Sequence, residues 1–153
     1  MNLRIMLTKN LGNLYSATYH SPIDTTDLFQ TSIVYGNSCG IAGTSKEYQE
    51  RLSSLIQRRD LSTLSSWLWS PNIEKQLYAI KGLKTMEKFG YQLTAKDSRI
   101  IKLISQKNGL INICSGCIYS ADSIKNVLAQ IEPYLFRAKT KTSDFSIVWQ
   151  LYH

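Results

Sequence analysis

The amino-acid sequence predicts an all-α domain, a compact bundle of about five or six short helices. Apolar residues recur at helical spacing in several segments, and helix start signals precede most of these segments. The apolar content of 43% is ordinary for a folded chain, and 153 residues are enough to bury one real core. We therefore expect a single domain over residues 1–153, with loosely held ends at 1–23 and 139–153.

The first third of the chain carries the weakest signals. We predict an irregular N-terminal segment, followed by a helix that begins at Asp24 and ends at Gly36. Asp27 would be the acidic third residue of its first turn. A strand over Ser32–Tyr35 is the rival prediction, because isoleucine, valine and tyrosine favour pleated backbone.

A glycine-rich loop, Gly36–Gly43, precedes the next predicted helix. Thr44 and Glu47 form a capping box that opens this helix, and an apolar stripe carries it to about Arg59. A glycine loop that leads into a helix can bind phosphate. The phosphate-binding motif places its lysine before the serine or threonine, however, whereas Lys46 follows Thr44 here. We therefore interpret the loop as a tight turn that lets two helices approach.

The segment from Asp60 to Gly90 has the clearest pattern and predicts two antiparallel helices. Asp60 would cap the first, Leu61–Trp69, and Ser70 would cap the second, Pro71–Phe89. Gly90 suits the position just past a helix end, where the backbone is commonly left-handed. Apolar side chains cover more than half the circumference of the second helix, which is typical of a central helix with several neighbours. They are Ile73, Leu77, Ala79, Ile80, Leu83, Met86 and Phe89.

This hairpin resembles one unit of a HEAT-type helical repeat, over residues 60–90. The resemblance rests on the short first helix, the Ser70-Pro71-Asn72 turn and the apolar run from Ile73 to Leu83. No second copy occurs at the period of about 40 residues that such repeats use. The resemblance implies an interaction scaffold rather than a catalyst.

Three further elements are predicted after Gly90. Thr94, with Asp97 as the third residue, would cap a helix that ends at Asn108–Gly109. Leu110–Ile113 would be a short extended run. The last helix would then begin at Ser120 or Asp122.

Pro133 should break or kink that last helix at Glu132, because a proline inside a helix costs about 3 kcal/mol. The segment Lys139–Ser143 looks like a solvated linker. Phe145–Tyr152 is apolar and β-prone, which favours a short C-terminal strand docked on the core, with a binding tail as the alternative.

Three cysteines form the one constellation with possible chemistry: the pair Cys114-x-x-Cys117 and the distant Cys39. The favoured interpretation is structural, in which Cys39 pairs with Cys114 or Cys117, or all three are packed thiols. A disulfide from Cys39 to the pair would close a loop of about 75 residues and contribute ~4 kcal/mol by loop entropy.

Three chemical interpretations compete with the structural one. A zinc site would use the three cysteines with His20 or His153 as the fourth ligand. Thiol–disulfide exchange would need the first sulfur of the pair at a helix N-terminus, which lowers its pKa. A lone nucleophile ranks last, because no histidine and carboxylate can be placed beside a cysteine from the sequence.

We predict a small helical binding or scaffold module without catalysis, and no cofactor. The alternative is a cysteine-based redox or zinc-binding protein that uses Cys39 and the Cys114–Cys117 pair. The tryptophans at 67 and 69 point in different directions, so we expect separate neighbours to pack them. The alternative is that one of them lies on the surface as a partner contact. The lysines at 81, 84 and 88 share one helix face, which we expect to be solvated. The candidate partner contacts are Trp67, Trp69, Lys81, Lys84 and Lys88.

The net charge of +7 is spread over the helical part of the chain. A basic surface attracts nucleic acid without specificity, but no motif that reads nucleic acid accompanies the charge. We therefore expect a protein partner rather than nucleic acid. No apolar run is long enough to span a bilayer, which predicts a cytoplasmic protein, or an exported one if a longer precursor exists or a disulfide is found.

Overall fold

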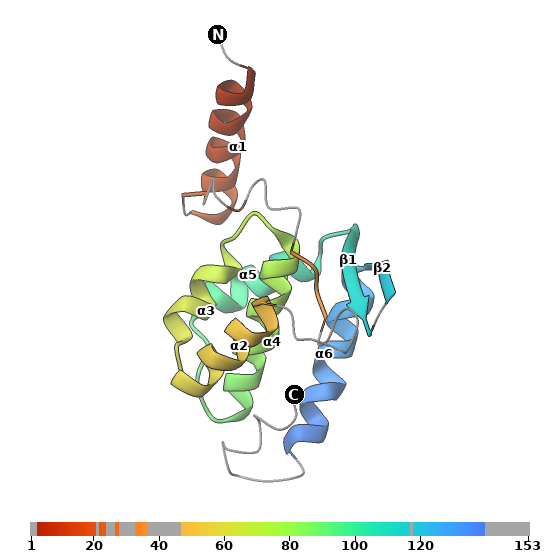
Figure 1. The fold of residues 1–153 in the computed structure, drawn as a ribbon. Helices are drawn as coiled ribbons and strands as arrows, with labels where there is room; N and C mark the ends of the chain where they lie inside the picture. Colours follow the sequence, from red (N-terminus) through yellow and green to blue (C-terminus); the bar gives the residue numbers. More distant parts are fainter. Residues whose placement is uncertain are drawn as a thin grey trace.

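The computed structural model describes residues 3–20, 22–23, 27, 33–36, 47–116 and 118–139, with the backbone only for 3–8 and 132–139. Within these residues it contains six helices and one two-stranded antiparallel hairpin (Figure 1). The predicted helical class is therefore confirmed, and the hairpin is an element that the sequence pattern did not predict.

Helix α4 (Ile73–Lys88) lies at the centre of the helical body. It contacts α2 (Glu47–Arg58), α3 (Leu61–Leu68), α6 (Ile124–Lys139) and strand β1 (Leu110–Ser115). Most of its apolar side chains are buried, as its wide apolar arc predicts. They include Leu77, Ala79, Ile80, Leu83 and Met86.

A glycine lets α4 approach its two neighbours closely. A Cβ atom at Gly82 would lie 2.7 Å from a methyl carbon of Leu52 in α2 and 2.7 Å from one of Leu64 in α3. Both leucines are completely buried. The three helices therefore meet at a point where only hydrogen fits on the central helix.

The helix caps confirm two predictions and correct one. Asp60 caps α3 by accepting from the Thr63 amide, and Thr94 caps α5 (Ala95–Ser105) by accepting from the Asp97 amide. The cap predicted at Ser70 is wrong, because Asn72 caps α4 and accepts from the Lys75 amide. The Ser70 hydroxyl instead donates to Asp27 Oδ2 at 2.7 Å.

The hairpin joins β1 to β2 (Ile118–Ser123), with Leu110 opposite Ser123 and Ser115 opposite Ile118. The extended run predicted from Leu110 is thus confirmed. The last helix begins at Ile124, later than predicted, because Ser120 and Asp122 belong to β2.

Residues 33–36 lie along the other edge of β1. Tyr35 donates to the Asn112 carbonyl and accepts from the Cys114 amide, which is a parallel bridge to Ile113. Tyr35 is therefore extended, as the rival strand prediction expects, but its bridge is isolated and residues 33–36 form no strand of their own. The predicted helix from Asp24 to Gly36 is wrong at residues 33–36, because pairing of Tyr35 with β1 requires extended backbone.

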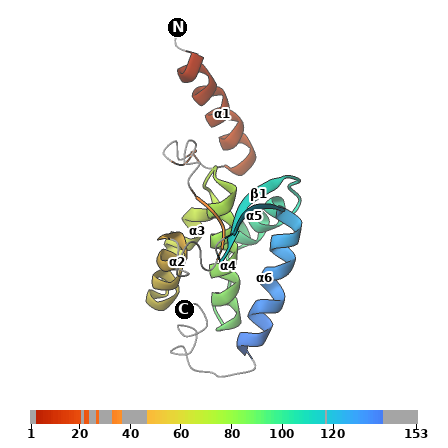
Figure 2. The same ribbon diagram turned by 45° about the vertical axis from the view of Figure 1, so that its right-hand side comes forward.

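Helix α1 (Leu3–Tyr19) corrects the predicted irregular N-terminus. It projects from one end of the helical body in both views (Figures 1 and 2). Its last residue, Tyr19, is buried against that body, with its ring centre 6.3 Å from that of Trp69.

Helix α6 runs without interruption through Pro133, so a break at Glu132 is wrong, and the alternative of a kink there stays a prediction. Burial of Ile124, Val127 and Ile131 against the core favours the helical path despite the proline. The predicted strand Phe145–Tyr152 and the glycine loop from Asn37 onward lie outside the described residues. Among the described residues, no helix combines the length and the apolar character that a bilayer crossing requires.

Candidate functional site

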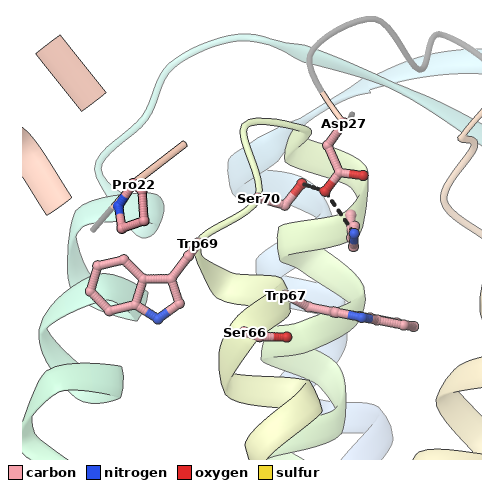
Figure 3. A pocket seen from close by; sticks show the side chains of 7 residues that line it. Pro22, Asp27, Ser66, Trp67, Trp69 and Ser70 are labelled. Atoms are coloured by element: carbon pink, nitrogen blue, oxygen red, sulfur yellow. Dashed lines mark hydrogen bonds and ion pairs between the residues drawn. The ribbon is translucent and has the colours of Figure 1, made fainter. Parts of the chain in front are cut away.

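Two cavities lie on either side of Trp69, the residue that follows α3. The first, which we call the polar cavity, has a volume of about 290 Å³ (Figure 3). It is lined by Pro22, Asp27, Ser66, Trp67, Trp69, Ser70 and Lys75. The second, which we call the basic cavity, has a volume of about 360 Å³. It is lined by Thr18, Tyr19, His20, Trp69, Ala95, Lys96, Arg99 and Ile100. We call the two cavities together the Trp69 site.

Three separate segments build the basic cavity. The end of α1 supplies Tyr19 and His20, the turn between α3 and α4 supplies Trp69, and the first turns of α5 supply Lys96 and Arg99. The Trp69 amide donates to the Ser66 carbonyl as the C-cap of α3, which holds the backbone under the indole. The site therefore depends on tertiary packing and on no single element.

A buried ion pair forms one end of the polar cavity. Asp27 Oδ2 accepts from Lys75 Nζ at 2.6 Å and from Ser70 Oγ at 2.7 Å (Figure 3). Only 4% of the Asp27 side chain and 14% of the Lys75 side chain are exposed. Burial of a carboxylate is tolerated when an opposite charge and hydrogen bonds compensate it. The two charges cancel, so this end of the cavity is polar but nearly neutral.

The two tryptophans line the polar cavity but have different neighbours (Figure 3). Trp67 is buried, packs at 5.5 Å from the ring of Tyr48, and has Lys75 Nζ 5.8 Å from its centre. Trp69 is half-buried, and Lys96 Nζ lies 3.9 Å from its ring centre. Trp69 is therefore the more accessible of the two rings.

The basic cavity carries positive charge. Lys96 and Arg99 are one helical turn apart on α5 and exposed, and His20 is exposed at the end of α1. The acid on the same helix, Asp97, is buried and accepts from Ser65 Oγ and Thr94 Oγ1, which turns it toward the α3–α5 contact. None of the described residues that line this cavity is acidic.

The prediction that three lysines of α4 form a solvated face is wrong for one of them. Lys81 is buried, and its Nζ lies 3.4 Å from Gln49 Oε1 in α2. Burial lowers the pKa of the Lys81 ammonium to about 8. Lys84 is half-buried and pairs with Glu87 at 2.9 Å, and Lys88 is half-buried. The physical reason is that α2 packs over this side of the central helix, which the lysine spacing does not reveal.

The cysteine constellation falls only partly within the described residues. Cys114 is buried in β1, with its amide donating to the Tyr35 carbonyl. It lies on a strand, so the helix N-terminus that activates an exchange pair is missing at this position. Cys39 and Cys117 lie outside the described residues, so their pairing with Cys114 stays a prediction.

The zinc alternative also stays a prediction. No three His, Cys, Asp or Glu side chains in the described part of the chain come together as a metal site. Two of the three cysteines and His153 fall outside that part. His20, the other predicted fourth ligand, is exposed and lines the basic cavity.

Searches of family models, curated proteins and solved structures found no match to this chain. The resemblance to a HEAT-type repeat therefore stays a prediction. The case for a function depends on the geometry of the Trp69 site.

Proposed function

We propose that this protein is a non-catalytic binding module that takes up a segment of another protein at the Trp69 site. The observation that carries the proposal is that one half-buried tryptophan forms a wall of both cavities. Tryptophan is enriched among residues that dominate binding energy, because it offers a large apolar surface with few rotatable bonds. A partner chain that crosses Trp69 would place one side chain on each side of the indole.

The contacts around Trp69 support a preorganised surface. The ring meets Tyr19 edge-on at 6.3 Å and has the Lys96 ammonium over it at 3.9 Å. A side chain that is ordered before binding loses little conformational entropy when a partner arrives. The anchor would therefore be ready in the free protein.

The cavity volumes favour a peptide segment over a large cofactor. Pockets for small-molecule ligands usually measure about 300–1,000 Å³; the polar cavity of about 290 Å³ lies just below that range and the basic cavity of about 360 Å³ lies near its lower end. Each is large enough for a side chain or two. Two such cavities that share Trp69 as a wall suit neighbouring side chains of one extended segment.

The polar groups of the site support binding rather than catalysis. In the polar cavity the Asp27 carboxylate accepts from both the Lys75 ammonium and the Ser70 hydroxyl, so these three groups are already hydrogen-bonded. Groups held in this way stabilise the packing of residue 27 against the start of α4. The Ser70 hydroxyl donates to a carboxylate, as an activated nucleophile would, but Ser70 is only 2% exposed and is therefore closed to a substrate.

Selection of random peptides displayed on phage tests this proposal. We expect the peptides that the full chain enriches to lose binding to the Trp69→Ala variant and to keep it in Tyr119→Ala. Tyr119 is a matched control because it is an exposed aromatic residue on β2, and it does not line either cavity. Circular dichroism verifies that both variants keep their helix content. Peptides that bind Trp69→Ala as well as the original chain would overturn the proposal.

A further inference from the structure

We propose that the segment bound at the Trp69 site is acidic, with its carboxylates on Lys96 and Arg99 in the basic cavity. This inference rests on the proposed function and adds the chemistry of the partner. It depends on the distribution of charge between the two cavities, which differs sharply.

Lys96 and Arg99 supply the charged hydrogen-bond donors of the basic cavity. The two side chains are one turn apart on α5 and both are exposed. No ion pair with another described residue engages either of them. The Lys96 ammonium is also held in place over Trp69 at 3.9 Å, so a carboxylate that binds it reaches the indole at the same time. Guanidinium and ammonium groups form their strongest hydrogen bonds with carboxylates.

Among the described residues, no acid lines the basic cavity or pairs with these cations. Asp97 is buried, accepts from the hydroxyls of Ser65 and Thr94, and does not line the cavity. Asp27 is paired with Lys75 in the polar cavity. The basic cavity therefore keeps its positive charge, whereas the polar cavity is nearly neutral. An incoming segment is thereby oriented, with its acidic residues on the α5 side of Trp69 and a polar or aromatic residue on the other side.

The same cations could attract the phosphates of RNA, but one observation favours an acidic protein segment. Lys96 and Arg99 line one cavity of about 360 Å³, which is large enough for a side chain or two but not for a run of phosphates.

Fluorescence anisotropy with three labelled probes tests the inference. The probes are a peptide of alternating glutamate and leucine, the same peptide with glutamine in place of glutamate, and a polyuridine RNA of equal length. The chain should bind the acidic peptide at least about ten-fold more tightly than the glutamine peptide. The affinity should fall about three-fold or more between roughly 50 and 300 mM salt, because the cations are exposed.

Charge-reversal variants locate the binding. The double variant Lys96→Glu/Arg99→Glu should bind the acidic peptide about ten-fold more weakly than the original chain, or weaker still. The affinity of Lys102→Glu for the same peptide should stay within about two-fold of the original. Lys102 is the matched control because it is an exposed lysine on the same helix that does not line the cavity. All three substituted residues are exposed, so the variants should fold as the original chain does.

Each contrary result has a distinct meaning. Equal binding of both peptides, with dependence on Trp69, overturns the acidic inference and leaves the proposed function standing. Tighter binding of the RNA, with dependence on Lys96 and Arg99, overturns the inference in favour of nucleic acid. If neither peptide binds and phage selection also yields no Trp69-dependent peptide, the inference and the proposed function both fail.

Discussion

The ammonium of Lys96 lies 3.9 Å from the centre of the Trp69 ring, although the two residues are far apart in the sequence. Trp69 is the C-cap that follows α3, and Lys96 lies in the first turn of α5. This contact joins the aromatic anchor of the proposed site to its positive charge. A cation over an indole face at an exposed position is worth about 0.5–1 kcal/mol, so the contact also contributes to the packing of α3 against α5.

Lys96→Met should lower the free energy of unfolding by about 0.5–1 kcal/mol, because methionine keeps an apolar stem but removes the charge over Trp69. Lys96→Arg should retain most of the stability, because guanidinium also stacks on indole. Urea unfolding followed by circular dichroism measures both. Lys102→Met, at an exposed position outside the cavity, is the control, and an equal loss there would contradict the assigned contact.

Gly82→Ala should destabilise the chain by about 1–3 kcal/mol, even though alanine favours helix more than glycine does. The added methyl group would meet Leu52 and Leu64 at 2.7 Å, and both are buried in a packed core. Urea unfolding of the variant gives the magnitude.

A double-mutant cycle identifies the cause of that loss. Combining Gly82→Ala with Leu64→Ala removes the Leu64 methyl groups but leaves Leu52 in place, so part of the crowding is relieved and the double variant should lose less than the sum of the single variants. Additive losses would show that crowding at this helix crossing is not the reason.

Because Lys81 is buried, we expect the free energy of unfolding to rise with pH in the alkaline range. Burial lowers its pKa in the folded chain to about 8, from an ordinary value of 10.5. Between these two values the unfolded chain binds more protons than the folded chain, so the free energy of unfolding increases with pH. Below pH 8 the ammonium is charged in both states and this slope vanishes. Tyr78, whose pKa burial raises to about 12 from 10.0, gives the opposite slope only above its ordinary value.

Comparison with Lys81→Met isolates this effect from other titrating groups. From pH 8 to pH 10, the original chain should gain about 2 kcal/mol relative to the variant. Urea unfolding at the two pH values measures the difference. A constant difference between the two proteins would mean that Lys81 is not held in a desolvated position.

The expected disulfide can be tested by counting the reactive thiols of the chain. Residues 33–36 lie parallel to β1, with Tyr35 bridged to Ile113, and Cys39 follows Gly36 at the same spacing at which Cys117 follows Cys114. We expect a disulfide from Cys39 to this pair. The unfolded, unreduced chain should then expose one reactive thiol, and the reduced chain three.

The disulfide and the zinc alternative separate in the same experiment. Three reactive thiols before reduction would contradict the disulfide. One zinc ion per chain, released together with the appearance of three thiols, would support the metal alternative.

Much of the helical fold could be predicted because its signals are local. Asp60 and Thr94 mark helix starts within three residues of the amides that they cap. The apolar arc of α4 predicts a central position because burial on several sides leaves its pattern in the sequence. Ser70 shows the limit of this reasoning, since its hydroxyl is used by Asp27, far away in the chain.

The missed elements lack such a pattern for a physical reason. Leu11 and Leu14 of α1 are exposed because the helix projects from the body, so no single buried stripe marks it as a helix. Strand β2 is exposed at Ile118 and Tyr119, which removes the alternation of a half-buried strand. The Trp69 site could not be predicted because the closeness of Trp69 to α5 and to the end of α1 is a result of tertiary packing.

The proposed binding of an acidic protein segment where Trp69 meets α5 can be observed residue by residue in an amide and indole NMR titration of the full chain with the acidic peptide. We expect the indole N–H of Trp69 and the amides of Lys96 and Arg99 to shift most, and those of the β1–β2 hairpin not to shift. Shifts centred on Ile118 and Tyr119, with the Trp69 indole unchanged, would contradict it.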